Sequence, residues 1–171
     1  MSWCLCHRRL GSCVVIGQNV AMDIRIVGPD DWSDWRHLRL RSLTENPEAF
    51  ASSVTMWTGN RDTEANWRSR LSSPGACFLA YDGAAPVGMV GAQPDDAGVE
   101  LVSMWVAAEG RRQGLGGQLI DAVIDWAGRR ALHLRVIDGN TAALTTYESQ
   151  GFVLQSGCVD DEGCRTMTRP A

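Results

Sequence analysis

The sequence predicts one α/β domain, and three observations predict this fold class. Short apolar runs of strand length alternate with longer segments in which apolar residues recur at helical spacing. A mostly apolar run at 99–107 leads into a glycine-rich loop, a helical segment and a further strand at 132–137. The length of 171 residues suits a single domain with its own core, and the sequence contains no repeats or linkers.

Residues 23–72 predict a strand followed by two helices. Ile24 and Ile26 alternate with their neighbours at the period of a strand. Pro47 ends the first helix, because the residue before a proline disfavours the helical conformation. A loop at 49–59 precedes the second helix, at about 61–72. The first helix is expected to bury one face and to hold three arginines mostly elsewhere; the face is Trp32, Trp35, Leu38, Ser42 and Leu43, and the arginines are Arg36, Arg39 and Arg41.

The pattern then changes to the period of strands. Residues 77–81 and 86–93 predict two strands joined by a turn at Asp82-Gly83. The run at 99–107 is mostly apolar, so it predicts a strand that is buried on both faces near the centre of the sheet. The remaining expected elements are a helix at 114–128, a strand at 132–137, a helix at 140–149 and strands at 152–155 and 165–168.

Residues 1–21 are expected to form an extension outside the domain, which then spans residues 22–171. The apolar stretch Val14-Val15-Ile16 is too short for a signal peptide. No apolar run reaches the length of a membrane span, which favours a cytoplasmic protein with no membrane partner. Sixteen arginines, no lysines and 20 acidic residues give a net charge of -4, which argues against a nucleic-acid partner and slightly favours a cationic acceptor.

The cysteines and histidines predict no metal site. The three histidines do not cluster with any cysteine, and no two cysteines form a CxxC pair. Cys158 and Cys164 are placed to face each other across a hairpin, but free thiols are expected in a reducing compartment.

The glycine-rich loop predicts an anion site where a strand meets a helix. It consists of Arg111, Arg112, Gln113, Gly114, Leu115, Gly116 and Gly117. The first N–H groups of a helix lack partners and lie at the positive end of its dipole, and glycines let an anion approach them. The two arginines are able to add charge-assisted bonds to phosphate. The absence of lysine excludes a Walker loop, and Leu119 stands where a dinucleotide fingerprint needs glycine. A tight turn that only opens a helix remains the alternative.

Two motifs in this order resemble the GNAT superfamily of N-acetyltransferases. Val106 is followed five residues later by Arg111 and then by x-x-Gly-x-Gly, which resembles the acyl-CoA signature. Downstream, Asn140-x-x-Ala143-x-x-x-Tyr147-x-x-x-Gly151-Phe152 matches a second block. The resemblance implies a mixed, mostly antiparallel sheet of about six or seven strands with about four helices and splayed central strands. It also implies that acetyl-CoA is the acyl donor, that no metal takes part, and that an amine attacks directly in a ternary complex.

The resemblance implies roles for residues of both motifs. Tyr147 is positioned like the family's general acid, near the coenzyme sulfur; the alternative is an amphipathic core tyrosine. Asn140, with Ala143 in the same block, contacts the coenzyme in the family and is also a good helix cap. In the family a bulge in the strand places the amides at the positions of Met104 and Val106 on the pantetheine and on the thioester oxygen.

Glu100 is the candidate general base. It lies six residues before Val106 on an otherwise apolar strand, where a charge is costly without a role or a partner. The same offset carries the glutamate base in the histone-acetylating branch of the superfamily. The alternative is a glutamate that pairs with an arginine or faces solvent. In a regular strand Ser103 and Trp105 point away from the face of Glu100 and Met104, and a bulge breaks this parity downstream.

The acceptor is the least determined part of the prediction. In the family the first two helices and their connection line the acceptor pocket, which gives Pro47 to Ser53 and Trp57 as candidates here. The leading hypothesis is a small-molecule amine N-acetyltransferase. A protein N-terminal or lysine acetyltransferase is the second, and a non-catalytic acyl-CoA-binding module is the third. Tyr147 and Glu100 argue against a pure binder, and a homodimer stays open.

Overall fold

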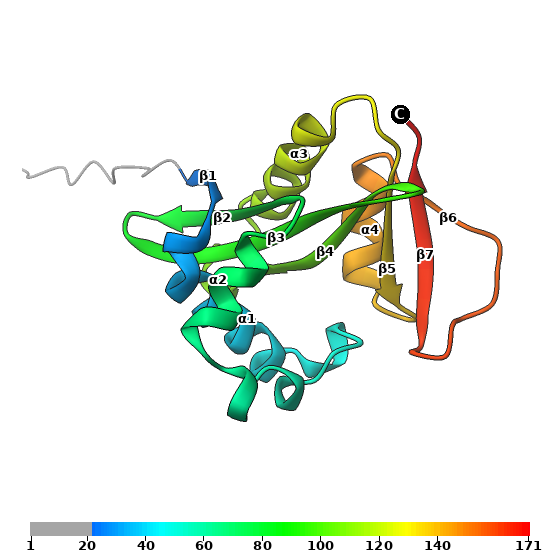
Figure 1. Cartoon of the computed structure of the whole chain (residues 1–171). Helices are drawn as coiled ribbons and strands as arrows, with labels where there is room; N and C mark the ends of the chain where they lie inside the picture. The colour runs from blue at the N-terminus through cyan, green and yellow to red at the C-terminus, as the bar shows by residue number, and fades with distance from the viewer. Residues whose placement is uncertain (1–21) are drawn as a thin grey trace, which may run out of the picture.

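In the computed structural model, which describes residues 22–171, seven strands form one mixed sheet (Figure 1). The strand order is β1-β2-β3-β4-β5-β7-β6, and all neighbours are antiparallel except the parallel pair β4–β5. The strands are β1 (Asp23–Val27), β2 (Ala76–Asp82), β3 (Ala85–Asp95), β4 (Gly98–Val106), β5 (Leu132–Ile137), β6 (Val153–Leu154) and β7 (Cys164–Arg169). The mixed, mostly antiparallel sheet is thereby confirmed.

Helices cover both faces of this sheet. The α-helices are α1 (Trp32–Glu45), α2 (Glu64–Leu71), α3 (Leu115–Ala127) and α4 (Thr141–Ser149). Short 3-10 turns occur at η1 (Pro29–Asp31), η2 (Pro47–Ala49), η3 (Val54–Met56), η4 (Gly59–Arg61) and η5 (Ala108–Gly110). α1 and α2 lie on one face, α3 lies on the other, and α4 lies beside α3 (Figure 1). The second helix begins later than predicted, because the Thr63 side chain caps it by accepting from Asn66 N at 3.3 Å.

The buried face of α1 is wider than its apolar residues indicate. Trp35, Leu38, Ser42 and Leu43 are buried as expected. Arg39 is also buried, with only 4% of its surface exposed, so the prediction that places it mostly off this face is wrong. The physical reason is helical spacing: Arg39 lies four residues after Trp35 and therefore shares its face.

A bulge in β4 redirects its side chains. Between the pairs Met89↔Trp105 and Gly91↔Val102, the chain advances by three residues on β4 but by only two on β3. Within this stretch Ser103 adopts a left-handed φ of 56°. On β3, residues that are an even number of positions apart share a face. The β4 residues that pair with one such set are Glu100, Val102 and Trp105, so these three lie together on the face toward α1. Met104 lies on the other face, close to Gly116 of α3: a Cβ built on that glycine would lie 3.5 Å from the Met104 Cε. The expected loss of parity downstream of a bulge is observed.

The strands β4 and β5 separate after a short paired stretch. They pair only from Val99↔Leu132 to Leu101↔Leu134, although both strands continue beyond these residues. β4 is therefore not buried on both faces, contrary to the prediction: Val99, Leu101 and Trp105 are buried, while Glu100 and residues 102–104 are half-buried. The splay opens the centre of the sheet and provides the walls of a cleft.

The predicted extension at residues 1–21 lies outside the described residues. Within residues 22–171, none of the helices combines the length and the apolar character that crossing a bilayer requires. The described chain therefore presents one sheet, its helices and the cleft at the splay as the setting for a functional site.

Candidate active site

The loop before α3 presents a row of free backbone donors. Gly114 caps α3 with a φ of 74°, and no side chain of the described residues forms a capping hydrogen bond there. Within residues 22–171, no hydrogen bond uses the amides of residues 112–117. Arg112 also has a left-handed φ of 61°. Six consecutive free amides at the positive end of a helix form the geometry that binds a phosphate or pyrophosphate.

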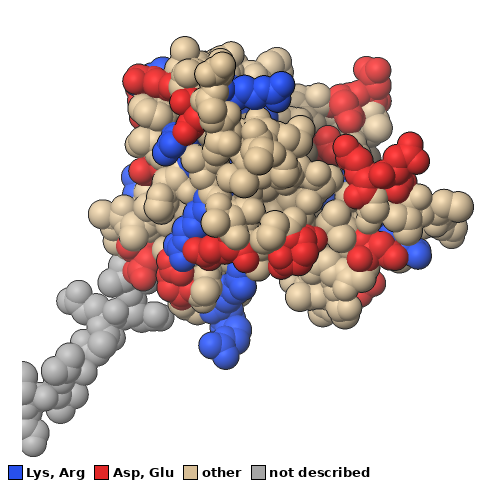
Figure 2. Space-filling model, turned by 90° about the horizontal axis from the view of Figure 1, so that it is seen from below, with Lys and Arg blue, Asp and Glu red and all other residues tan. Residues whose placement is uncertain are grey.

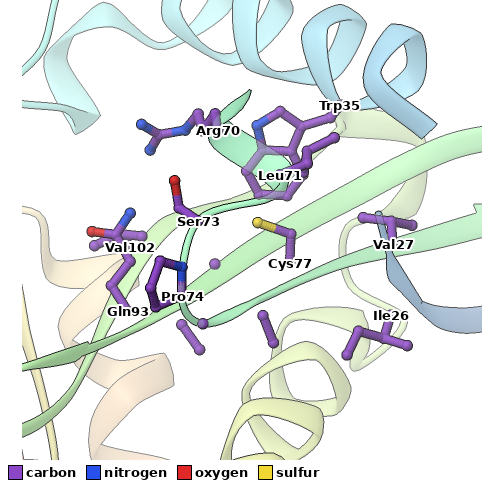
Figure 3. A pocket seen from close by; sticks show the side chains of 14 residues that line it. Ile26, Val27, Trp35, Arg70, Leu71, Ser73, Pro74, Cys77, Gln93 and Val102 are labelled. Atoms are coloured by element: carbon purple, nitrogen blue, oxygen red, sulfur yellow. The ribbon is translucent and has the colours of Figure 1, made fainter. Parts of the chain in front are cut away.

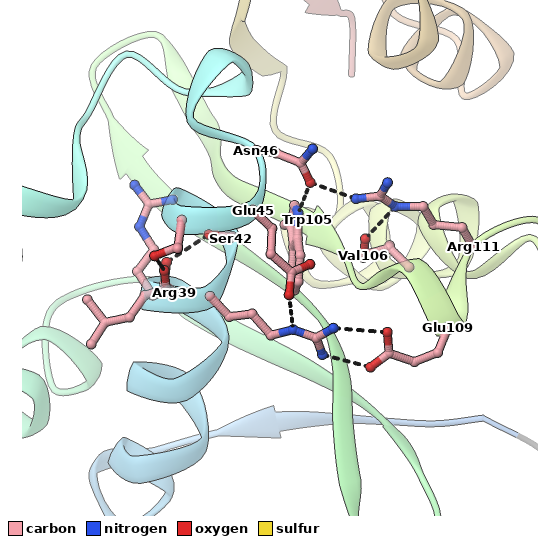
Figure 4. Close-up of polar contacts among 11 residues, drawn as sticks. Arg39, Ser42, Glu45, Asn46, Trp105, Val106, Glu109 and Arg111 are labelled. Atoms are coloured by element: carbon pink, nitrogen blue, oxygen red, sulfur yellow. Dashed lines mark hydrogen bonds and ion pairs between the residues drawn. The ribbon is translucent and has the colours of Figure 1, made fainter.

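The two arginines of this loop differ in what they contact. The Nε of Arg111 donates to the Val106 carbonyl at 2.8 Å, and its Nη2 donates to Asn46 Oδ1 at 2.8 Å (Figure 4). Arg111 is thus held by contacts within the protein, and its expected contact with phosphate stays a prediction. Arg112 is exposed and has no side-chain partner among the described residues. Arg112 is therefore the arginine that is free to reach an anion on the loop.

A cleft of about 350 Å³ opens where β4 and β5 diverge. Residues from β4, β5, α4 and the connection between α1 and α2 line it. The predicted site residues that it brings together are Glu100, Met104, Asn140, Ala143 and Tyr147. Met104 also joins the cleft to the loop, because a Cβ placed on Gly116 lies 3.5 Å from its Cε. The phosphate loop and the cleft are therefore contiguous.

Tyr147 lies at the cleft within a mostly apolar setting. It is 8% exposed, and its ring makes an edge contact with Phe152 at a centroid distance of 5.8 Å. Burial raises the pKa of the Tyr147 hydroxyl well above its usual value, because the phenolate is poorly solvated there. The residue therefore packs as a core tyrosine and also presents a phenol that stays protonated at neutral pH.

Asn140 combines capping with a position at the cleft. Its Oδ1 accepts from Ala143 N at 3.2 Å, which caps α4 as expected. Both residues line the cleft, so the start of α4 faces the space between the splayed strands. The cap fixes the helix that carries Tyr147 and leaves the amide nitrogen of Asn140 unused by the cap.

The acceptor side of the cleft contains residues that were predicted and others that were missed. Ala49 to Ser52 and Trp57 line it, whereas Pro47, Glu48 and Ser53 do not. Glu100 lies half-buried on this side, on the face of β4 that points toward α1. Arg39 and Arg70 also line the cleft and were not predicted to. Both arginines lie one helical turn after a tryptophan, Trp35 or Trp67, that is buried. This spacing is the feature of the sequence that could have predicted their position on the inner face of each helix.

A polar contact holds the connection between α1 and α2 in place. Asp62 accepts from Arg36 Nε at 2.5 Å and from Trp67 Nε1 at 2.8 Å. These bonds, with Arg36 as the larger cause, lower the pKa of Asp62 to about 2. Trp67 in turn stacks on Trp57 with a centroid distance of 5.4 Å. The aromatic wall of the cleft is thereby tied to α1.

A second, smaller cavity lies between α1, α2 and the sheet (Figure 3). Its volume of about 60 Å³ suits one or two waters, so it is too small for an acyl donor or an amine. Cys77 lines it, and burial raises the pKa of this thiol to about 11, which makes it a poor nucleophile. Among residues 22–171, no group of His, Cys, Asp or Glu is arranged to hold a metal ion. The larger cleft is therefore the candidate active site.

Comparison with known proteins agrees with this geometry. The sequence model of the acetyltransferase (GNAT) family matches residues 32–152. N-acetyltransferase 8 of Homo sapiens is 34% identical over 120 residues, which cover 64% of this chain and 52% of that protein. The chain thus spans about half the length of this relative.

Solved structures of acetyltransferases share the fold, and two of them illustrate the likeness. A phosphinothricin acetyltransferase from Sinorhizobium meliloti in complex with acetyl-CoA has a TM-score of 0.68 and 19% identity, over 87% of this chain and 88% of that chain. The ribosomal-protein-S18-alanine N-acetyltransferase from Escherichia coli has a TM-score of 0.64 and 22% identity, over 87% and 93%. At these identities the likeness concerns the fold alone. Because the family match extends over most of the chain and includes both motifs, the chain belongs to the acetyltransferase (GNAT) family.

Proposed function

We propose that this protein transfers an acetyl group from acetyl-CoA to the primary amine of a small molecule, in a ternary complex within the domain at 22–171. The observation that carries the proposal is that Tyr147 of α4 and Glu100 of β4 line the same cleft where β4 and β5 separate. Family membership supports the reaction class, and the acetyl-CoA complex of a structural neighbour supports the donor.

The coenzyme would lie along the loop and the splay. The free amides of residues 112–117 would bind the pyrophosphate, with Arg112 adding a positive charge. Met104 lies within the bulge and Val106 follows it, and their amides would meet the pantetheine and the thioester oxygen. Asn140 and Ala143 would contact the coenzyme from the start of α4.

Two side chains then serve the chemistry. The amine nitrogen attacks the thioester carbon, and the C–S bond breaks to release the coenzyme thiolate. The Tyr147 phenol, kept protonated by its raised pKa, gives its proton to this sulfur. Glu100 accepts the proton that the amine loses, directly or through a water molecule. No covalent enzyme intermediate is required.

The size of the cleft favours a small acceptor over a protein. Its volume of about 350 Å³ lies in the range of small-molecule sites. Phe50 and Trp57, from the connection between α1 and α2, line its acceptor side. A protein N-terminus would need an open path for the chain that follows it.

A thiol-release assay tests this function directly. The intact protein is incubated with acetyl-CoA and a panel of small amines and peptides, and free coenzyme thiol is measured. We expect amine-dependent release, and we expect Glu100→Gln to flatten the acidic limb of the pH–rate profile, whereas Glu48→Gln, outside the cleft, leaves it unchanged. Thiol release with peptides alone would favour the protein acetyltransferase. Coenzyme binding without release for any amine would favour the non-catalytic module.

A further inference from the structure

Among the residues that the structure describes, Arg39 is a buried cation without a carboxylate partner. Its Nη2 donates to Ser52 Oγ at 2.6 Å, whereas its Nε and Nη1 have no hydrogen-bond partner in this part of the chain. Its guanidinium group lies 4.8 Å from the ring centroid of Phe50 and 5.1 Å from that of Trp57. Burial, and to a smaller extent the charge of Arg70, lower the pKa of Arg39 to about 10. Arg39 therefore remains positively charged at neutral pH inside the wall of the cleft.

Arg70 is a second unpaired cation beside the first. Its guanidinium group lies 4.5 Å from the centroid of the same Trp57 ring, and the residue is half-buried. Within residues 22–171, its side chain forms neither a hydrogen bond nor an ion pair. Figure 3 shows it pointing away from Leu71 and Cys77 of the small cavity. Since it also lines the larger cleft, it is placed to meet a ligand there.

The other charges of the cleft do not neutralise this pair. Arg135 donates to Asp160 and to Glu162, each at 2.6 Å, so these three groups satisfy one another. Glu100 is then the one carboxylate of the cleft that forms no ion pair among the described residues. The cleft holds two unpaired cations and one unpaired anion, although the whole chain has a net charge of -4. On the face that Figure 2 shows, acidic side chains lie at the right, along the lower edge and at the upper left, with arginines between them.

We propose that the amine acceptor also carries a carboxylate group, which Arg70 binds directly and Arg39 stabilises through its charge. The inference rests on the proposed acetyl transfer and names its substrate class: an amino acid, with its amine toward Glu100. Direct contact falls to Arg70, because the free N–H groups of Arg39 are closed off from solvent. The net charge of the sequence favours a cationic acceptor, whereas this proposal gives an acceptor that carries both an amine and a negatively charged carboxylate.

Several other arginines of the described chain pair with carboxylates, which Arg39 and Arg70 do not. Arg36, Arg41, Arg68 and Arg135 each bind at least one carboxylate within the fold. Burying a cation without such a partner costs free energy that an apolar side chain would not. A carboxylate bound by Arg70 would place the missing opposite charge beside both guanidinium groups, so part of this cost is offset when the ligand is bound.

Matched pairs of acceptors test the inference on the intact protein. The panel contains α- and ω-amino acids with small and large side chains, each beside its carboxamide, which keeps the amine and lacks the negative charge. We expect at least one amino acid to exceed its amide about tenfold or more in kcat/KM. Thiol release without any such preference overturns this inference and leaves the proposed function standing. Absence of thiol release with every amine overturns the proposed function itself. A preference for aminophosphonates over amino acids overturns the inference that the acidic group of the acceptor is a carboxylate.

Two arginines of α2 provide a matched pair of variants. Arg70→Gln removes the cation at the cleft, whereas Arg68→Gln removes one that pairs with Asp30 and Glu64 at the surface. We expect Arg70→Gln to raise KM for the amino acid, so that the ratio of kcat/KM for the amino acid to that for its amide falls to near one. The kcat/KM for the amide should change less than about threefold. Arg68→Gln should keep the ratio. A ratio that survives Arg70→Gln contradicts the proposal.

A variant of Arg39 must be tested for both stability and substrate preference, because the side chain is buried in the fold as well as close to the cleft. Arg39→Met keeps an unbranched side chain against Phe50 and Trp57 and removes the unpaired charge. We expect an equal or higher Tm together with a reduced preference for the amino acid over its amide. A lower Tm with an unchanged preference would assign Arg39 to the fold and contradict its part in binding.

Discussion

Arg111 of the phosphate loop and Asn46 at the end of α1 are joined by a 2.8 Å hydrogen bond from Nη2 to Oδ1. The same oxygen accepts from Trp105 Nε1 at 3.0 Å, and Arg41 donates to Glu109 of η5, just before the loop, at 2.7 Å (Figure 4). One side-chain oxygen therefore connects α1, the strand β4 and the loop before α3. This link ties the acceptor side of the cleft to the coenzyme side.

The first prediction concerns this link. Asn46→Ala leaves the buried Trp105 Nε1 without a partner and frees Arg111, so we expect a loss of about 1–3 kcal/mol in the free energy of unfolding. The KM for acetyl-CoA should rise as well, because the loop loses its anchor. Urea unfolding and steady-state kinetics measure both effects. Asn60→Ala is the control, since Asn60 is exposed, and an equal effect of the two variants would refute the role of the link.

The second prediction compares two glycines with similar backbone conformations. Gly114 has a φ of 74° and Gly83 a φ of 60°, and a Cβ on either lies no closer than 3.9 Å to another group. Alanine at either position should cost about 1–2 kcal/mol through its left-handed conformation. Because the amides of the phosphate loop follow the geometry at Gly114, Gly114→Ala alone should weaken acetyl-CoA binding. Calorimetric titration checks this, and equal affinities in the two variants would contradict the assignment of the loop.

The third prediction concerns the general acid. Tyr147→Phe keeps the ring against Phe152 and removes the hydroxyl, so kcat should fall by about 100-fold or more while the Kd for acetyl-CoA stays within about twofold. Tyr81→Phe is the control, because its hydroxyl binds Asp34 at 2.9 Å on another part of the fold. Since burial raises the pKa of Tyr147, loss of its proton should not reduce the wild-type rate below about pH 10. An unchanged kcat in Tyr147→Phe would remove it from the mechanism.

The fourth prediction concerns stability and pH. Asp62 has a pKa of about 2 in the folded protein, below its value of about 4 in an unfolded chain, so its charge stabilises the fold above pH 4. This contribution is lost as the pH falls toward 2. Asp62→Asn should lower the free energy of unfolding at pH 7 by about 1–3 kcal/mol, and its difference from wild type should shrink between pH 4 and pH 2. Urea unfolding across this range measures it, with exposed Asp96→Asn as control; a constant difference would contradict the prediction.

The sequence predicts those features that depend on local pattern. Alternating and helical periods place the strands and helices within a few residues, and the spacing from Asn140 to Tyr147 places both on one short helix that faces the cleft. The bulge was expected from the family motif, and the pairing of β3 with β4 agrees with it.

Features that depend on distant contacts were not predicted. Arg111 contacts Asn46 across 65 residues of sequence, so its local context gave no sign that its side chain is engaged. The burial of Arg39 was missed because its charge argued against the position that helical spacing gives it. The open face of β4 was missed because an apolar strand at a splay has the same composition as one that is covered on both sides.

Titration of the intact protein with acetyl-CoA tests the central claim most directly, because every proposed role depends on that ligand. We expect one molecule to bind per chain and the free energy of unfolding to rise by about 2.7 kcal/mol at a concentration one hundred times Kd. Gly114→Ala should show a smaller rise than Gly83→Ala at the same concentration. The absence of binding heat and of any change in stability at millimolar acetyl-CoA would contradict the account.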